Sequence, residues 1–267
     1  MKKLLIYNDL KPVVRQQHAN LSLKKGTTFE FARETNAVPL VVAEFGRASQ
    51  DFALVFTEAE EGVIPSAILG LRTNENAYVS ADGVWQAAYV PAFIRRYPFV
   101  FATDAAAQTF TLMVDETYSG FNTENRGERL FDGDGENTGF LDQTLAFLKD
   151  YQAHFERTRA FGEKLAELDL LEAVEARVPM PEDPERRLTG FKVVNRDKLK
   201  ALSDDVLAQL VRDDFLELIF LHLFSLNNLA KLHGKLLDSA DDAAAPAAAS
   251  VAIPAPAPAP RTKGKKA

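Results

Sequence analysis

Residues 139–168, GFLDQTLAFLKDYQAHFERTRAFGEKLAEL, decide the fold class of this chain of 267 residues. Thr138, directly before this stretch, is a suitable N-cap because its hydroxyl can accept a hydrogen bond from a free backbone N–H. Apolar side chains then recur at the spacing of a helix face, at Leu141, Leu145, Leu148, Phe155, Leu165 and Leu168. We predict one long helix over 139–168, bent near Gly162.

Short apolar runs bounded by turn residues flank this helix and predict strands. Before the helix, the candidate strands are 52–56, 63–71, 77–80, 99–102 and 110–114; after it, they are 171–178 and 188–194. The run 39–45 fits either a strand or a short helix. Pro65 lacks a backbone donor, so its strand is expected at a sheet edge or at a bulge. We predict an α+β fold in which 40–115 and 171–194 form one mainly antiparallel sheet with the helices packed on it.

Two further helices are expected near the C-terminus. Ser203 is a suitable N-cap for the first, which runs to about Arg212, and Asp213-Asp214 separates it from a second helix over 215–232. The second helix is apolar on more than one face, with Leu216, Ile219, Phe220, Leu223, Phe224, Leu226 and Leu229. Such a helix must be covered, either inside its own domain or at an interface with a protein partner or a second copy.

The composition suggests one α+β domain over 1–238, followed by an Ala/Pro-rich tail over 239–267 with a basic end. The tail offers too little apolar surface to offset its ordering entropy, so we expect it to be disordered. The chain carries a formal net charge of -7 and no cysteine. These values argue against a nucleic-acid partner and exclude disulfides and thiol chemistry.

No membrane span is expected from the most apolar run, 215–226, which contains Glu217 and His222 and is shorter than the ~20 residues that cross a bilayer. The apolar start of the chain ends at Asn8, too early for a signal peptide. A cytoplasmic location follows as an expectation.

The segment from Trp85 to Phe99 is the most site-like part of the chain. It places two arginines beside aromatic side chains, and its candidate ligand-binding residues are Trp85, Tyr89, Arg95, Arg96 and Tyr97. Guanidinium groups next to rings can form a pocket for a carboxylate or phosphate. The alternative is structural: an arginine pairs with a buried carboxylate while the aromatic rings fill the core.

Other motifs offer no catalytic or metal site. Residues 131–137 suggest a calcium loop, but the positions that require Gly and Glu hold Asn137 and Gln143, so a glycine-rich turn is the better interpretation. His222 and His233 lie too far apart along a helix for one metal ion, and His222 is expected to be a buried, hydrogen-bonded histidine. No nucleotide-binding or hydrolase motif occurs. We predict no metal and no cofactor, and the sequence favours a non-enzymatic protein.

Taken together, several segments resemble the SapC family over roughly residues 10–236. They are Trp85…Tyr89-Val-Pro91…Arg95-Arg96-Tyr97-Pro98-Phe99, Leu130-Phe131-Asp132…Gly135, Gly190-Phe191…Asp197-Lys198-Leu199…Leu202-Ser203, and Leu218-Ile219-Phe220-Leu221-His222-Leu223…Ser225-Leu226. The resemblance implies a bacterial protein whose relatives are encoded beside TonB-dependent outer-membrane receptors. The label of peptide-transport permease that such proteins often carry disagrees with the absence of a predicted span. The family has no agreed catalytic residues to transfer.

Three hypotheses follow. The first is a non-enzymatic accessory or regulatory protein of bacterial nutrient uptake that acts through partners. The second is a small-molecule-binding protein or enzyme with an anion-accepting pocket around Trp85–Phe99, and the third is a protein associated with the surface layer. A pocket lined by Arg95 or Arg96 would favour the second hypothesis, and an exposed apolar helix face would favour the first.

Overall fold

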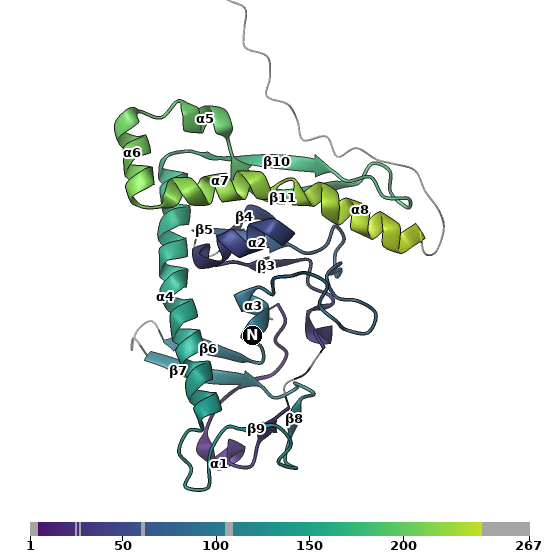
Figure 1. Cartoon of the computed structure of the whole chain (residues 1–267), viewed down its shortest axis with the longest axis vertical. Coiled ribbons are helices and arrows are strands. Elements are labelled where there is room, and N and C mark those ends of the chain that lie inside the picture. The colour runs from purple at the N-terminus through teal and green to yellow at the C-terminus, as the bar shows by residue number, and fades with distance from the viewer. Residues whose placement is uncertain (1–4, 25, 27, 60–61, 105–108, 242–267) are drawn as a thin grey trace, which may run out of the picture.

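The computed structural model describes residues 5–24, 26, 28–59, 62–104 and 109–241. Its helices and antiparallel strands confirm the α+β class (Figure 1). The strands are β1 (Leu10–Pro12), β2 (Ser22–Leu23), β3 (Ala37–Pro39), β4 (Ala53–Ala59), β5 (Gly62–Ile68), β6 (Phe99–Asp104), β7 (Thr109–Asp115), β8 (Phe121–Asn122), β9 (Glu128–Arg129), β10 (Leu171–Arg177) and β11 (Arg187–Val194). The helices are α1 (Arg15–His18), α2 (Phe45–Asp51), α3 (Ala92–Arg95), α4 (Gly139–Glu167), α5 (Arg196–Lys200), α6 (Asp204–Arg212), α7 (Phe215–Ser225) and α8 (Asn228–Asp241), with short 3-10 helices η1 (Glu30–Ala32) and η2 (Val42–Glu44).

The largest sheet has the strand order β10-β11-β4-β5-β3 and is antiparallel throughout. Its centre is the hairpin β4–β5, which pairs without interruption from Ala53↔Ile68 to Ala59↔Gly62. The two strands that follow the long helix join this sheet, as predicted. Strand β11 meets β4 through the single pair Lys192↔Phe56.

The prediction of one shared sheet is wrong for the hairpin β6–β7. These strands form a separate three-stranded sheet with β1, in which Lys11 pairs with Val114. The N-terminal strand that supplies this partner has no clear pattern in the sequence. A third small sheet has the order β8-β2-β9.

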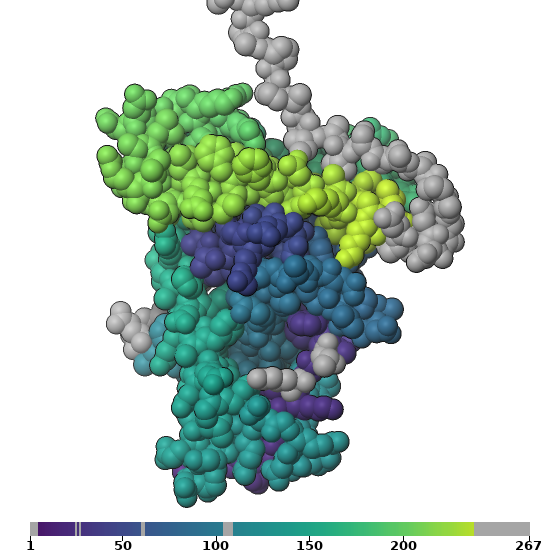
Figure 2. Space-filling model, viewed as in Figure 1, coloured from purple at the N-terminus to yellow at the C-terminus, as the bar shows by residue number. Residues whose placement is uncertain are grey.

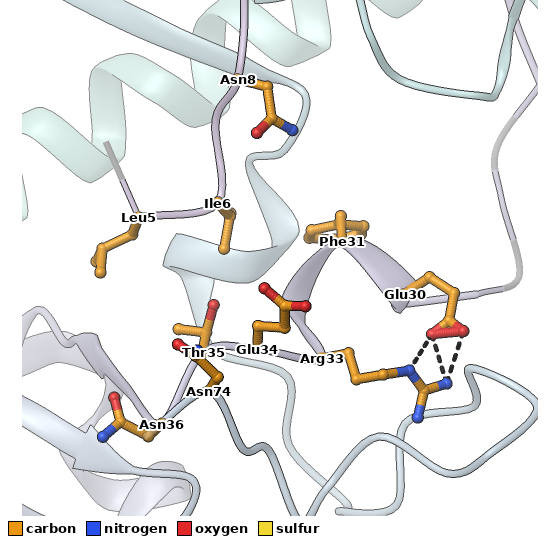
Figure 3. A pocket seen from close by; sticks show the side chains of 10 residues that line it. All are labelled: Leu5, Ile6, Asn8, Glu30, Phe31, Arg33, Glu34, Thr35, Asn36 and Asn74. Carbon is orange, nitrogen blue, oxygen red and sulfur yellow. Dashed lines mark hydrogen bonds and ion pairs between the residues drawn. The ribbon is translucent and has the colours of Figure 1, made fainter. Parts of the chain in front are cut away.

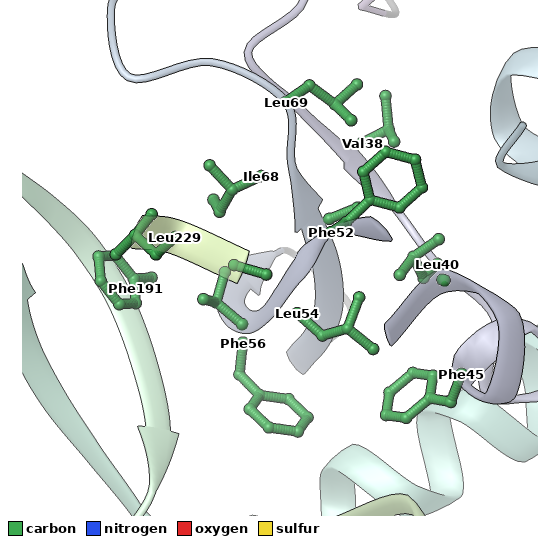
Figure 4. Packing of buried hydrophobic residues seen from close by; sticks show 14 of the residues in the cluster. Val38, Leu40, Phe45, Phe52, Leu54, Phe56, Ile68, Leu69, Phe191 and Leu229 are labelled. Atoms are coloured by element: carbon green, nitrogen blue, oxygen red, sulfur yellow. The ribbon is translucent and has the colours of Figure 1, made fainter. Parts of the chain in front are cut away.

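The long helix is confirmed as α4, and Thr138 caps it by accepting a hydrogen bond from the Leu141 N–H at 3.4 Å. Phe161 on α4 is fully buried and packs its ring against those of Phe45 and Phe56. This part of the core, with the strand residues drawn in Figure 4, lies between the main sheet and the helices α2, α4 and α7.

Helix α7 is joined to the main sheet by hydrogen bonds as well as by apolar contacts. His222 is fully buried; its Nδ1–H donates to the Leu54 carbonyl at 2.9 Å and its Nε2 accepts the Val194 N–H at 3.1 Å. The Ser225 hydroxyl accepts the Leu54 N–H at 2.9 Å. His222 is therefore the satisfied buried histidine that the sequence indicates.

The C-terminal helix differs from its predicted bounds. It divides after Ser225 and resumes at Asn228, whose side-chain amide donates to the carbonyls of Ser49 and Phe52 at 2.7 and 3.0 Å. Helix α8 then continues to Asp241, so the first three residues of the expected tail are helical; residues 242–267 lie outside the described residues.

One stretch of the described chain, Phe215–Leu237, is long and apolar enough to cross a membrane on length and composition. Core helices of soluble proteins satisfy the same criterion, and here 44% of its most apolar window is buried within the protein.

Two strand predictions are wrong in detail. Strand β5 was expected at a sheet edge or a bulge, but it lies between β4 and β3. Strand β3 pairs with β5 only as far as Ser66, so Pro65 lies just beyond this pairing. The missing donor of Pro65 therefore breaks no ladder bond, and its carbonyl still accepts the Leu40 N–H. Residues 77–80 make only an isolated bridge, Val79↔Trp85, because the Asn76 side chain turns the chain by accepting the Tyr78 N–H.

Candidate functional site

Trp85 and Tyr89 form the first half of the candidate segment and are tied to each other. The indole Nε1–H of Trp85 donates to the Tyr89 carbonyl at 2.8 Å. The indole also packs against the rings of Phe29, Phe52 and Tyr78, with centroid distances of 5.5, 6.3 and 6.2 Å. Trp85 is thus partly buried against the main core and anchors the segment.

Glu44 is a buried carboxylate that the sequence analysis did not single out. Its Oε1 accepts the Tyr89 hydroxyl at 2.8 Å and the Ala92 N–H at 2.6 Å, and its Oε2 accepts the Val41 N–H at 3.0 Å. Burial raises the pKa of Glu44 above its ordinary value, even though these hydrogen bonds and the charge of Arg95 lower it. The sequence signal for this buried carboxylate is an acidic residue inside the apolar run 39–45.

Arg95 is exposed, and its side chain hydrogen-bonds to the residues just before α3. Its Nε donates to the Val90 carbonyl at 3.0 Å, and one terminal nitrogen donates to the Tyr89 hydroxyl at 3.3 Å. Its guanidinium carbon also lies 5.2 Å from the ring centre of Phe147. Arg95 therefore uses part of its hydrogen-bonding capacity within the segment.

Arg96 has a different environment, since aromatic rings surround its guanidinium group. The guanidinium carbon lies 4.2, 4.9 and 5.7 Å from the ring centres of Phe93, Tyr151 and Tyr7. Within the described residues it has no ion-pair partner, and its buried Nε has no hydrogen-bond partner. The structure thus gives Arg96 cation–π contacts where the structural alternative expected a carboxylate.

Tyr7 connects this arginine to the neighbouring tyrosine. Its hydroxyl donates to the Phe99 carbonyl at 2.9 Å, and its ring centre lies 5.4 Å from that of Tyr97. Burial raises the pKa of Tyr7 to about 12, although the charge of Arg96 acts to lower it.

Tyr97 reaches a second buried carboxylate, that of Asp115. Its ring stacks on Phe31 with a centroid distance of 4.1 Å, and its hydroxyl lies 3.4 Å from Asp115. Burial opposes ionisation of Asp115, but hydrogen bonds from the Thr117 hydroxyl and the N–H groups of Asn8, Thr117 and Asp9 outweigh it and lower the pKa. Asp115 therefore fastens the N-terminal segment to the end of β7.

The five candidate residues are neighbours, but they do not line the cavity in Figure 3. That cavity has a volume of about 580 Å³ and lies between the N-terminal segment and η1. Its lining residues are Leu5, Ile6, Asn8, Glu30, Phe31, Arg33, Glu34, Thr35, Asn36 and Asn74. Phe31 lines the cavity and stacks on Tyr97, so it links the cavity to the candidate segment.

The acidic loop before α4 forms a turn. Asp132 Oδ1 accepts the N–H groups of Asp134 and Glu136 at 3.0 and 2.9 Å. Among the described residues, no group of three or more His, Asp or Glu side chains is placed to hold a metal ion.

A profile of the SapC family matches residues 13–232. This chain belongs to the SapC family. Neither a curated protein nor a solved structure is similar enough to this chain to match it.

The SapC match covers all five candidate residues, the helix α4 and the whole of α7. Helix α7 is where the largest exposed apolar side chains of the C-terminal half gather. Phe220 and Phe224 are 44% and 68% exposed, whereas Ile219 and Leu223 on the same helix are buried. Of the seven apolar residues expected to be covered, these two phenylalanines are exposed.

Proposed function

We propose that this SapC-family chain is a non-enzymatic accessory or regulatory protein of bacterial nutrient uptake that acts by binding a protein. The observation that carries the proposal is the exposed aromatic pair Phe220 and Phe224 on α7. The segment α6–α8, green to yellow, lies across the upper end of the molecule in Figure 2. Phenylalanine is enriched where proteins meet and is costly to leave in water.

The other side of α7 explains why this surface suits recognition. His222 and Ser225 bind both backbone groups of Leu54, and Ile219 is fully buried. The helix is therefore held in one position, so a partner that binds its aromatic side chains does not have to order the helix backbone. Support for uptake as the process comes from the resemblance, which implies that SapC relatives are encoded beside TonB-dependent receptors.

Complementation in the host tests this function. In a strain lacking the gene, we expect wild type to restore growth on a nutrient that enters through a TonB-dependent receptor, such as a ferric siderophore as sole iron source. Phe224→Asp should fail, because a charge on the exposed ring position blocks association. Val84→Asp is the matched control, since Val84 is also exposed (48%) but lies far along the chain from α7.

Growth rates are compared at equal protein levels, measured by immunoblotting. Full restoration by Phe224→Asp would contradict a role for this surface. Growth of the deletion strain at the wild-type rate on every such nutrient would contradict the role in uptake.

A second candidate function is anion binding at Arg96. It is favoured by the half-buried guanidinium that has no carboxylate partner among the described residues and whose Nε is unsatisfied. A carboxylate or phosphate would supply the missing negative charge and would accept hydrogen bonds from the terminal N–H groups of the guanidinium.

Thermal unfolding with inorganic phosphate and with small dicarboxylates tests this second function. A ligand at about 100 times its Kd stabilises the folded state by about 2.7 kcal/mol, which raises Tm by roughly 5–10 °C. We expect the rise for wild type and for Arg95→Gln, but not for Arg96→Gln. An equal rise for Arg96→Gln would place the anion elsewhere.

A further inference from the structure

The exposed face of α7 and α8 carries a symmetric pattern of charge around Phe224. Glu217 precedes Phe224 by seven residues and Lys231 follows it by seven. Seven residues are nearly two helical turns, so Glu217 and Phe224 lie close to one line on α7. Lys231 lies beyond the interruption at residues 226–227, on the exposed side of α8. Both charged residues are exposed, and neither has a hydrogen-bond or ion-pair partner in the described part of the chain.

The three exposed side chains are distributed over both helices. Although α7 ends at Ser225 and α8 begins at Asn228, the two run nearly end to end (Figure 1) and together form the helical stretch Phe215–Leu237. At about 1.5 Å per residue, Glu217 and Lys231 each lie roughly 10 Å from Phe224 along the axis.

The pattern is complementary to itself in one orientation. If two copies meet with their α7–α8 helices antiparallel and a twofold axis at Phe224, Glu217 of each copy faces Lys231 of the other. Phe220 then lies within about one turn of Phe224 of the second copy. A parallel arrangement would place Glu217 against Glu217 and is disfavoured by repulsion.

We propose that the occupant of this face is a second copy of the chain, bound as an antiparallel, isologous dimer centred on Phe224. The contact uses the same surface on both copies, which is the usual geometry of a twofold dimer. The proposed contact involves only these two helices of each copy, so we expect a weak dimer with a dissociation constant in the micromolar range. The dimer deepens the proposed function because it names the protein that binds to α7. It rests on that function only because both use the exposed face with Phe220 and Phe224.

Charge reversal on the full-length protein tests the dimer. Sedimentation velocity is measured from about 1 to 300 µM at low salt, where ion pairs are least screened, and the mass is expected to rise from the 29.5 kDa of the monomer toward twice that value. Glu217→Lys and Lys231→Glu should each weaken dimerisation about tenfold, because each creates two like-charged pairs across the axis. The double variant should recover wild-type affinity, since the swap restores both pairs.

Lys149→Glu on α4 is the control for net charge and should dimerise as wild type does. Phe224→Asp should stay monomeric at every concentration, with circular dichroism confirming that it is folded. A wild-type protein that is monomeric up to 300 µM, or a double variant as weak as either single variant, would overturn the dimer.

The two proposals fail separately. A monomeric wild type together with loss of growth in Phe224→Asp leaves the uptake role with a different partner. If the wild type forms a charge-dependent dimer but Phe224→Asp still supports growth, the dimer is correct and this surface has no role in uptake.

Discussion

Replacing His222 with alanine is expected to lower the free energy of unfolding by about 4 kcal/mol. The imidazole lies where β4 and β11 separate beyond their single pair, Lys192↔Phe56. It supplies a donor to the Leu54 carbonyl and an acceptor to the Val194 N–H. Alanine leaves both buried backbone groups without a partner and opens a cavity beside Phe56, whose ring centre is 4.8 Å from the imidazole.

Urea unfolding at neutral pH measures this loss, with His154→Ala as the control. His154 is exposed on α4, and its replacement should change the free energy of unfolding by less than about 0.5 kcal/mol. A His222→Ala variant as stable as wild type would show that α7 does not bridge the two strands in this way.

The same histidine makes stability depend on pH. Burial lowers the pKa of His222 to about 4; the Leu54 carbonyl opposes this shift, and the charge of Arg196 adds to it. In the unfolded chain the pKa is near the ordinary value of 6.5. Between these two pH values the unfolded state binds more protons than the folded state. The contribution of His222 to the free energy of unfolding is therefore complete above about pH 6.5 and is lost as the pH falls toward 4.

The loss amounts to on the order of 3 kcal/mol across this window. His222→Gln, which keeps a neutral donor and acceptor, should be less stable than wild type at neutral pH but should lose this part of the pH dependence. Urea midpoints at a series of pH values give the comparison. Parallel profiles for wild type and His222→Gln would assign the pH dependence to other groups.

The elements of this fold that could be predicted from the sequence are those with strong local patterns. The periodicity of 139–168 and the cap at Thr138 give α4 to within one residue of its observed end. The strands β4 to β7, β10 and β11 were also recognisable, whereas residues 77–80 form only an isolated bridge. The division of these strands into two sheets could not be predicted, because the partner of β7 is the weakly patterned N-terminal strand β1. Strand pairing depends on distant segments, which a local pattern does not encode.

In the candidate segment, the kinds of neighbouring residues could be predicted from the sequence, but the directions of the side chains could not. The sequence placed Arg95 and Arg96 among aromatic residues, and the structure keeps that neighbourhood. It could not show that the two side chains diverge, with Arg95 at the surface beside Tyr89 and Arg96 between Phe93 and Tyr151. Adjacent residues at the end of a helix point in different directions, so their partners are set by tertiary packing.

Gly162→Ala is expected to be among the most destabilising single-methyl changes in the chain. Gly162 is the point where α4 meets β5, and a Cβ there would lie 2.1 Å from the Val63 carbonyl oxygen. Since that oxygen belongs to the backbone of the main sheet, the helix must move away. The shift separates Phe161 and Leu165, both fully buried, from their contacts. We expect a loss of about 3 kcal/mol and a fall in Tm of roughly 6–12 °C.

Gly234→Ala is the matched control, because it makes the same chemical change within a helix where a Cβ would meet nothing within 4 Å. Alanine favours the helix over glycine by about 0.5–1 kcal/mol, so this variant should be slightly more stable than wild type. Thermal unfolding of the two variants separates steric contact from helix propensity, which acts in the same direction in both. Should Gly162→Ala also be stabilised, propensity alone would account for both glycines, and the close contact between α4 and β5 would be wrong.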